Sequence, residues 1–130
     1  IFYNEICHYR GPTLTLIYDN HNHIFGGFTS KSWSNNSGYK IDKQAFLFNL
    51  FPNNKIFIQN PNNFGKNAVY HGFGSRLHFG RTDLVVKGFY DNQGSSILNT
   101  YKFKHKISDS KLCFQNFTVI DMEMFYIWDT

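Results

Sequence analysis

The stretch Gly11–Trp33, GPTLTLIYDNHNHIFGGFTSKSW, carries the clearest structural pattern in the sequence. Polar and apolar residues alternate along Thr13–Tyr18, which is the period of a β-strand with one buried face. The turn-forming residues 19–23, DNHNH, separate this run from a second apolar run that starts at Ile24. The pattern predicts a β-hairpin, in which the pair Gly26–Gly27 marks a bulge or the close approach of another backbone. We expect the tryptophan that ends the stretch to anchor the core.

Length and composition indicate one folded domain. The chain has 130 residues, of which 42% are hydrophobic, 19% aromatic and 17% charged, and this composition excludes a disordered tail. Folding should bury about two-thirds of the surface of the unfolded chain. No run approaches the ~18 apolar residues that a membrane-spanning helix needs. The chain opens on Ile1–Tyr3 without an initiator methionine or a signal peptide, so we expect residues 1–130 to be a single domain within a longer polypeptide.

The charge and the cysteines argue against two classes of function. The net charge of +4 and the pI near 9.1 are mildly basic, but no nucleic-acid motif accompanies them, so we expect no nucleic-acid partner. Cys7 and Cys113 allow at most one disulfide, and a core of this size does not need one. We therefore expect free thiols and a cytoplasmic protein.

Short apolar runs separated by turn clusters continue along the chain and favour antiparallel β structure. The expected fold is mainly β (β-rich α+β), with two antiparallel sheets packed as a sandwich and a few short peripheral helices, one of them at Ile1–His8. The run Ala45–Leu50 is almost continuously apolar, which indicates a central strand. Further strands are expected at Lys55–Gln59, Ala68–His71, Asp83–Lys87, Tyr101–Ile107 and Phe117–Trp128.

Two of these strands have informative patterns. Aromatic residues and lysines alternate in Tyr101–Ile107, which favours an amphipathic edge strand over a nucleic-acid or lipid surface. In Phe117–Trp128, Asp121 and Glu123 share a face with Phe117 and Phe125, so we expect a bulge or an edge position near the two acids.

No motif for catalysis, for a cofactor or for a metal stands out. The glycine-spaced segment Gly72–Gly80 lacks the third glycine of a dinucleotide fingerprint and the Gly-Lys-Ser/Thr of a phosphate loop. His21 and His23, at positions i and i+2, are better explained by a solvated hairpin tip than by a metal site, because the other histidines are scattered. An antioxidant enzyme working through Cys7 or Cys113 is a weak alternative.

Four motifs resemble those of the TLDc domain, which belongs to the oxidation-resistance family of eukaryotic proteins. These are GPTL (11–14), IFGGFTSKSW (24–33), GYKIDKQAFLF (38–48) and FGRTDL (79–84). The resemblance runs from Phe2 to Ile127. It implies a non-catalytic module without a cofactor, which binds the soluble sector of the vacuolar proton pump (V-ATPase) and is linked to oxidative-stress resistance.

The same resemblance leaves an alternative function open. The chain departs from the family pattern at Leu98–Asn99 and at Leu112–Phe114, where the family has glycine. A structural or adaptor subunit of a large cytoplasmic or cytoskeletal assembly, for example a ciliary one, is therefore a second hypothesis. Either function implies protein partners, through which the domain is associated with organelle membranes or the cytoskeleton without inserting into a membrane.

Loops on a rigid β scaffold are where such folds usually bind their partners. We expect the interaction surface at the hairpin tip, at the loop after Trp33 and in the glycine-rich segment. The candidate residues are Asp19, His21, His23, Asn35, Asn36, Arg76 and His78.

Overall fold

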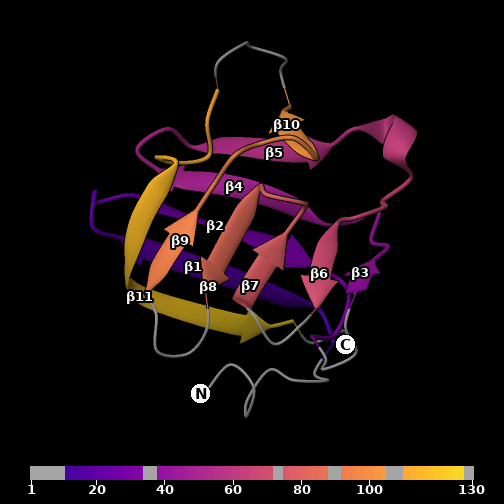
Figure 1. The fold of residues 1–130 in the computed structure, drawn as a ribbon, viewed down its shortest axis with the longest axis horizontal. Coiled ribbons are helices and arrows are strands. Elements are labelled where there is room, and N and C mark those ends of the chain that lie inside the picture. Colours follow the sequence, from indigo (N-terminus) through magenta and orange to yellow (C-terminus); the bar gives the residue numbers. More distant parts are fainter. Residues whose placement is uncertain (1–10, 34–37, 72–74, 88–91, 105–109, 128–130) are drawn as a thin grey trace.

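The computed structural model describes residues 11–33, 38–71, 75–87, 92–104 and 110–127 (Figure 1). The expected helix at Ile1–His8, with Cys7, lies outside these ranges. So do the candidate residues Asn35 and Asn36.

The described residues form a mainly β structure, as expected, with almost no helix. A single 3-10 turn, η2 (Pro61–Asn63), is the helical element in this part of the chain. Local patterns do not predict β3, β7 and β9, which lie in glycine-rich or polar segments. The strands are β1 (Thr13–Asp19), β2 (Ile24–Thr29), β3 (Gly38–Lys40), β4 (Phe46–Phe51), β5 (Lys55–Gln59), β6 (Val69–His71), β7 (Ser75–Phe79), β8 (Leu84–Lys87), β9 (Gln93–Ser95), β10 (Tyr101–Phe103) and β11 (Asn116–Tyr126).

The strands join into one antiparallel sheet of order β10-β5-β4-β2-β1-β11-β9-β8-β7-β6-β3. β11 is eleven residues long and pairs with β9 through its first part and with β1 through its second part. The expectation of two separate sheets in a sandwich is not confirmed, because this strand makes one continuous sheet. Figure 1 shows the half containing β6–β9 lying in front of the half containing β1, β2, β4 and β5.

Aromatic side chains connect the two halves of the sheet. Phe25 of β2 meets Phe117 with ring centroids 5.0 Å apart, and Phe79 of β7 lies 5.7 Å from the ring of Trp33. A Cβ atom on Gly27 would lie 2.7 Å from the ring of Phe79. On Gly26 it would collide with the carbonyl oxygen of Thr15, which confirms the predicted close approach of another backbone.

Trp33 is the expected core anchor. Its side chain is 1% exposed, and its Nε1–H donates a hydrogen bond to Thr13 Oγ1 at 2.9 Å. This bond ties the end of the motif IFGGFTSKSW to the first residue of β1. It also explains why a threonine can occupy a buried position in that strand.

The alternation predicted for β1 is present, and the structure shows which of its two faces meets the core. Thr13, Thr15 and Ile17 are buried, whereas Leu14 and Leu16 are half-exposed on the outer side of the sheet. Leu14 and Leu16 therefore point away from the core, whereas Ile17 belongs to it.

β11 contains the predicted bulge. Tyr18 pairs with Asp121 but Asp19 pairs with Val119, so Ile120 is the extra residue. The bulge reverses which residues face the core: Val119 is buried before it, and Met122 is buried after it. Phe117 and Phe125 consequently lie on different faces, and Phe125 is 48% exposed.

β10 and β4 differ in their positions in the sheet and in which of their faces are buried. β10 is at one edge of the described sheet, with Tyr101 buried and Lys102 exposed, which confirms the amphipathic edge strand over Tyr101–Phe103. β4 is paired on both sides, by β2 and β5, so it is interior as expected. However, only one of its faces is buried, because Phe46 and Phe48 are half-exposed on the other.

Candidate interaction surface

Several residues of the sequence motifs hold the fold together instead of forming a reactive site. The buried carboxylate of Asp42 accepts hydrogen bonds from Thr29 Oγ1 at 2.6 Å, from the N–H and hydroxyl of Ser30 at 2.7 Å each, and from the N–H of Gln44 at 3.0 Å. These bonds join the end of β2 to the start of β4. Asp42 therefore stabilises the turn before β4.

Asp83 has a similar structural role. Its Oδ2 accepts N–H groups from Asn99 at 2.8 Å, Thr100 at 2.9 Å and Tyr101 at 2.8 Å. Burial raises the pKa of this carboxyl group, and the backbone hydrogen bonds partly oppose the rise. The departure from the family pattern at Asn99 thus falls in a turn that Asp83 holds in place.

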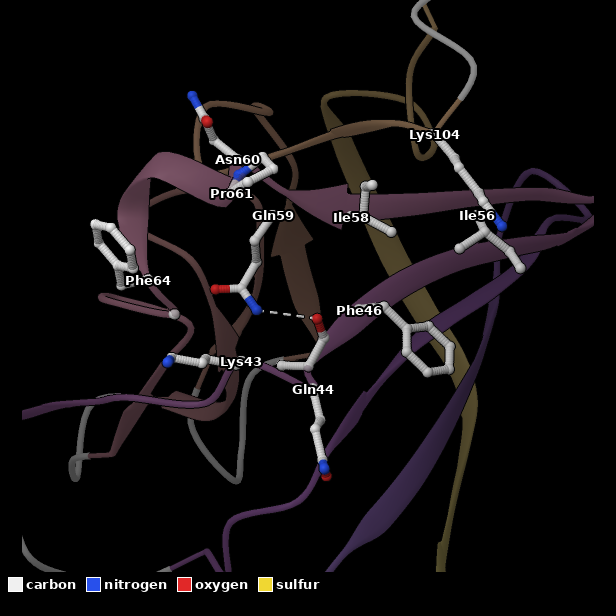
Figure 2. A pocket seen from close by; sticks show the side chains of 12 residues that line it. Lys43, Gln44, Phe46, Ile56, Ile58, Gln59, Asn60, Pro61, Phe64 and Lys104 are labelled. Atoms are coloured by element: carbon white, nitrogen blue, oxygen red, sulfur yellow. Dashed lines mark hydrogen bonds between the residues drawn. The ribbon is translucent and has the colours of Figure 1, made fainter.

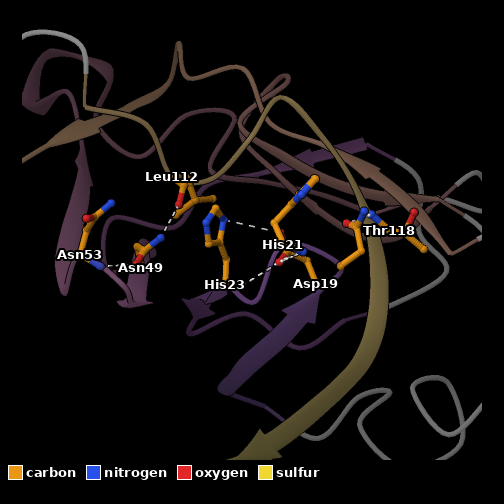
Figure 3. A network of polar contacts seen from close by, with 8 residues as sticks. Asp19, His21, His23, Asn49, Asn53, Leu112 and Thr118 are labelled. Atoms are coloured by element: carbon orange, nitrogen blue, oxygen red, sulfur yellow. Dashed lines mark hydrogen bonds and ion pairs between the residues drawn. The ribbon is translucent and has the colours of Figure 1, made fainter.

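The hairpin tip is fastened to the rest of the domain (Figure 3). Asp19 is buried, and its Oδ1 accepts the N–H groups of His21 and His23 at 2.9 Å each. Asn20 exchanges two hydrogen bonds with Thr118 of β11, of 3.0 and 2.8 Å. Asp19 therefore shapes the loop from inside, and the exposed part of the tip lies at Asn20 and Asn22.

The two histidines of the tip pack against a ring instead of standing free in solvent. His21 and His23 both meet Phe114 edge-on, with centroids 4.5 and 5.0 Å from it. The expectation of a simply solvated tip is therefore wrong. Nδ1 of His23 lies 3.7 Å from Asp19 Oδ2, but the described residues contain no group of three or more His, Cys, Asp or Glu side chains that could hold a metal ion.

His78 belongs to a different aromatic group. Its ring lies 5.0 Å from Tyr70 and 6.3 Å from Tyr39, and its Nε2–H donates to the carbonyl of Arg81 at 3.0 Å. Burial lowers the pKa of this imidazole, so the neutral form is favoured. Arg76 lies in β7, and its side chain is outside the described part. The contacts among the described residues do not bring His78 together with the hairpin tip, so the candidate residues do not form one site.

Cys113 has the environment of a structural thiol. It is buried, and burial raises the pKa of its thiol to about 12. A thiol with such a pKa is almost entirely protonated at neutral pH, whereas the thiolate is the nucleophile in cysteine chemistry. This residue therefore offers little support for thiol catalysis.

The largest feature that sequence analysis missed is an apolar surface on the outer side of the sheet. Residues directly opposite each other on neighbouring strands share a face, and the register aligns one row across β11, β1, β2, β4 and β5. The rings of Phe28 and Phe46 stack within this row at 5.4 Å. The row is Phe125, Leu14, Phe28, Phe46 and Ile58.

A second row runs beside the first, through Leu16, Gly26, Phe48 and Ile56. We refer to the two rows together as the outer apolar face. Ile56 at one end is 45% exposed, and a groove of about 370 Å³ lies over Leu14, Leu16, Phe48 and their neighbours. Isolated soluble domains rarely expose a contiguous apolar area of this kind, and such areas usually mark a site of interaction.

Opposite charges stand at the two ends of the outer apolar face. Ile58 is paired with Lys102 on the edge strand, whereas Leu16 is paired with Glu123 on β11. Both charged side chains are exposed. The surface is therefore basic at its β10 end and acidic at its β11 end.

The one sequence feature that could have revealed this surface is the excess of apolar residues. The segments Thr13–Tyr18 and Ala45–Leu50 together contain enough apolar residues to require that both faces of the sheet be shielded from water. Local patterns do not show which face meets the core, so the outer apolar face is visible only after the strands are placed.

Comparison with known proteins shows the family of the chain. The chain matches the family model of the TLDc domain over residues 1–127. The MTOR-associated protein MEAK7 of Danio rerio is 43% identical over 51 residues, which are 39% of this chain and 11% of that protein. The human protein of the same name is 29% identical over 73 residues, which are 54% of this chain and 16% of that protein.

The mouse protein of this name is 29% identical over 91 residues, covering 55% of this chain and 20% of its own length. The chain thus spans no more than about a fifth of these curated relatives. The family match, in contrast, covers all of the described residues and includes the motifs that form the hairpin and the Asp42 and Asp83 turns. This chain belongs to the TLDc domain family.

Proposed function

We propose that this domain is a non-catalytic protein-interaction module and that it binds its partner through the outer apolar face. The observation that carries the proposal is the in-register row from Phe125 to Ile58, which crosses five paired strands on the exposed side of the sheet. Burying one such large apolar side chain is worth roughly 1.5–3 kcal/mol. Because association has its own free-energy cost, several residues of the row must contribute together to a specific complex.

The polar residues support binding over catalysis. Asp42 and Asp83 are occupied by backbone and hydroxyl donors that maintain turns, and burial keeps the thiol of Cys113 protonated. Asp42 and Asp83 are therefore not free acids or bases, and Cys113, although it lines a small pocket, is not a thiolate nucleophile. The described residues also contain no helix long and apolar enough to cross a membrane.

The resemblance to the oxidation-resistance proteins suggests a more specific partner. We propose that the outer apolar face contacts the soluble sector of the V-ATPase from the cytoplasm and thereby contributes to oxidative-stress resistance. The curated relatives are named MTOR-associated proteins, which agrees with a role in regulatory protein complexes. Association with MTOR is a second candidate for the complex that contains this chain.

The test is affinity purification of the full-length protein from its native cells, with mass spectrometry of the proteins recovered. One bait carries Leu14→Ser and Phe125→Ser, which pair on the outer apolar face. The control carries Ile97→Ser, a 50% exposed apolar residue outside that face. Circular dichroism melting of the purified domain checks that both variants fold.

We expect peripheral V-ATPase subunits to be recovered with the wild type and the Ile97→Ser control but not with the double variant. Recovery of the same subunits in the same ratio with the double variant would show that the outer apolar face is not the binding surface. If V-ATPase subunits are absent and cytoskeletal or other assembly proteins are recovered in ratio, the domain is a structural subunit or adaptor.

A further inference from the structure

A groove of about 520 Å³ lies at the β5 end of the outer apolar face (Figure 2). Its floor is apolar and contains Phe46 of β4 with Ile56 and Ile58 of β5, all of which belong to the outer apolar face. One wall is the loop that contains η2, where Phe64 is 66% exposed. The groove is therefore continuous with the surface that we propose for binding.

The charged side chains that line this groove are positive. Lys43 and Lys104 contribute to it, and no Asp or Glu is among the described residues that line it. In Figure 2, Lys43 and Phe64 lie toward one end of the view, and Lys104 and Ile56 lie toward the other. A ligand that fits must combine apolar side chains for the floor with negative charge near both ends.

Gln59 provides a fixed polar group in the same groove. Its Nε2 donates to the carbonyls of Asp42 at 2.7 Å and Ala45 at 3.0 Å, so the amide orientation is set. Its Oε1 has no hydrogen-bond donor among the described residues, although the side chain is only 9% exposed. This oxygen is enclosed by the protein and Gln59 lies on the buried side of β5, so the residue fixes the wall of the groove and is not itself a contact for a ligand.

The pairing of the strands decides the form of that ligand. At the floor, Ile58 is flanked by Phe46 of β4 on one side and by Lys102 of β10 on the other. A partner strand cannot add to strands that are already paired on both sides. A segment that lies on the sheet face must satisfy its own backbone N–H and C=O groups, and an α-helix does so.

We propose that this groove binds an acidic amphipathic helix of a partner protein, with apolar side chains on Phe46, Ile56 and Ile58 and carboxylates near Lys43 and Lys104. This inference rests on the proposed function and adds the chemistry of the partner.

The probe for this proposal is a fluorescent synthetic peptide of about 18 residues, a length above the ~12–15 needed for helicity in water. It carries leucines at i, i+3, i+4 and i+7, two glutamates near each end, and alanine or glutamine elsewhere, because these residues favour a helix and a run of like charges would not. A matched peptide has lysine in place of every glutamate. Fluorescence anisotropy measures the binding of each peptide to the chain.

We expect the glutamate peptide to bind and the lysine peptide not to bind. The double substitution Lys43→Glu and Lys104→Glu should weaken binding of the glutamate peptide about tenfold or more, because it replaces two attractions by repulsions. The matched control, Lys31→Glu and Lys111→Glu, makes the same change of net charge at exposed lysines outside the groove and should leave binding unchanged. Equal binding of both peptides, or equal losses in the two charge variants, would overturn the proposal.

The outcomes separate this inference from the proposed function. Suppose that the Leu14→Ser/Phe125→Ser variant loses the native partner, whereas the Lys43→Glu/Lys104→Glu variant retains the partner and binds the glutamate peptide as the wild type does. The domain is then an interaction module as proposed, but the groove is not a site for an acidic helix. Light scattering of the purified chain tests whether a second copy of the chain, and not a partner protein, occupies the outer apolar face. A dimer that the Leu14→Ser/Phe125→Ser variant abolishes would assign the face to a second copy of the chain and would also overturn the groove proposal.

Discussion

Replacing Trp33 by alanine should lower the free energy of unfolding by about 4 kcal/mol, within the range for truncating a buried tryptophan or phenylalanine. Trp33 is 1% exposed and packs against His71 and Phe79, with ring centroids 5.0 and 5.7 Å away. Its Nε1–H also donates to the hydroxyl of Thr13. The truncation therefore combines a cavity with the loss of a buried hydrogen bond, and the bond alone is worth about 1 kcal/mol.

This loss is large enough to measure by heat or by denaturant. For 130 residues the average unfolding entropy is about 0.27 kcal/mol/K, so 4 kcal/mol corresponds to a fall in Tm of roughly 15 °C. Urea unfolding followed by circular dichroism should show the same loss with an unchanged m value. Phe64→Ala, at an aromatic side chain that is mostly exposed, is the control and should stay within about 0.5 kcal/mol.

Trp33→Phe refines the same experiment. It keeps most of the ring but removes the donor to Thr13, so it should cost clearly less than Trp33→Ala. An alanine variant that unfolds at the wild-type midpoint would refute the assignment of Trp33 to the core. If that variant also lost its partner, Trp33 would belong to the interaction surface.

Three further predictions concern single polar groups. Asp42→Ala should cost about 3 kcal/mol in urea unfolding, because four buried or half-buried donors lose a charged acceptor; a loss no larger than that of the exposed-site control Lys31→Ala would contradict this. In a Cys7→Ser background, Cys113 should react with iodoacetamide at neutral pH only after unfolding, because burial raises its pKa to about 12; mass spectrometry showing rapid labelling of the folded chain would disprove a structural thiol. Burial lowers the pKa of His78 below its ordinary value of 6.5. Between pH 6.5 and the lowered pKa the unfolded chain therefore binds more protons than the folded chain, so the free energy of unfolding falls as the pH drops through this range. His78→Gln should lessen that fall in Tm scans above and below pH 6.5, and an unchanged pH dependence would show that His78 does not contribute.

Much of the framework follows from local chemistry. Turn formers and alternation predicted the hairpin of β1 and β2, and the apolar runs predicted β4, β5, β6, β8 and most of β11. The face shared by charged and apolar residues in β11 predicted a bulge, which is at Ile120. β3 and β9 have only three residues each, which is too short to show an alternating pattern. These strands form through pairing with their neighbours in the sheet.

The candidate site was predicted less well, for a physical reason. Loop residues such as His21 and His23 look solvated in sequence, but Phe114 packs against them from a segment far along the chain. Contacts of this kind depend on tertiary placement, which local composition does not contain. That these loops bind a partner remains a prediction.

The sequence by itself determined that the chain is β-rich, that Trp33 is a core anchor and that the chain resembles a TLDc domain, because periodicity, residue size and motif identity are local properties. The orientation of β1 and β4 was decided only by the tertiary structure. An alternating strand can turn either face inward, and the choice depends on what the opposite half of the sheet presents. Here Trp33 provides a donor for the buried hydroxyl of Thr13, which favours the orientation with Thr13 inside, and Leu14 and Leu16 lie on the outer apolar face.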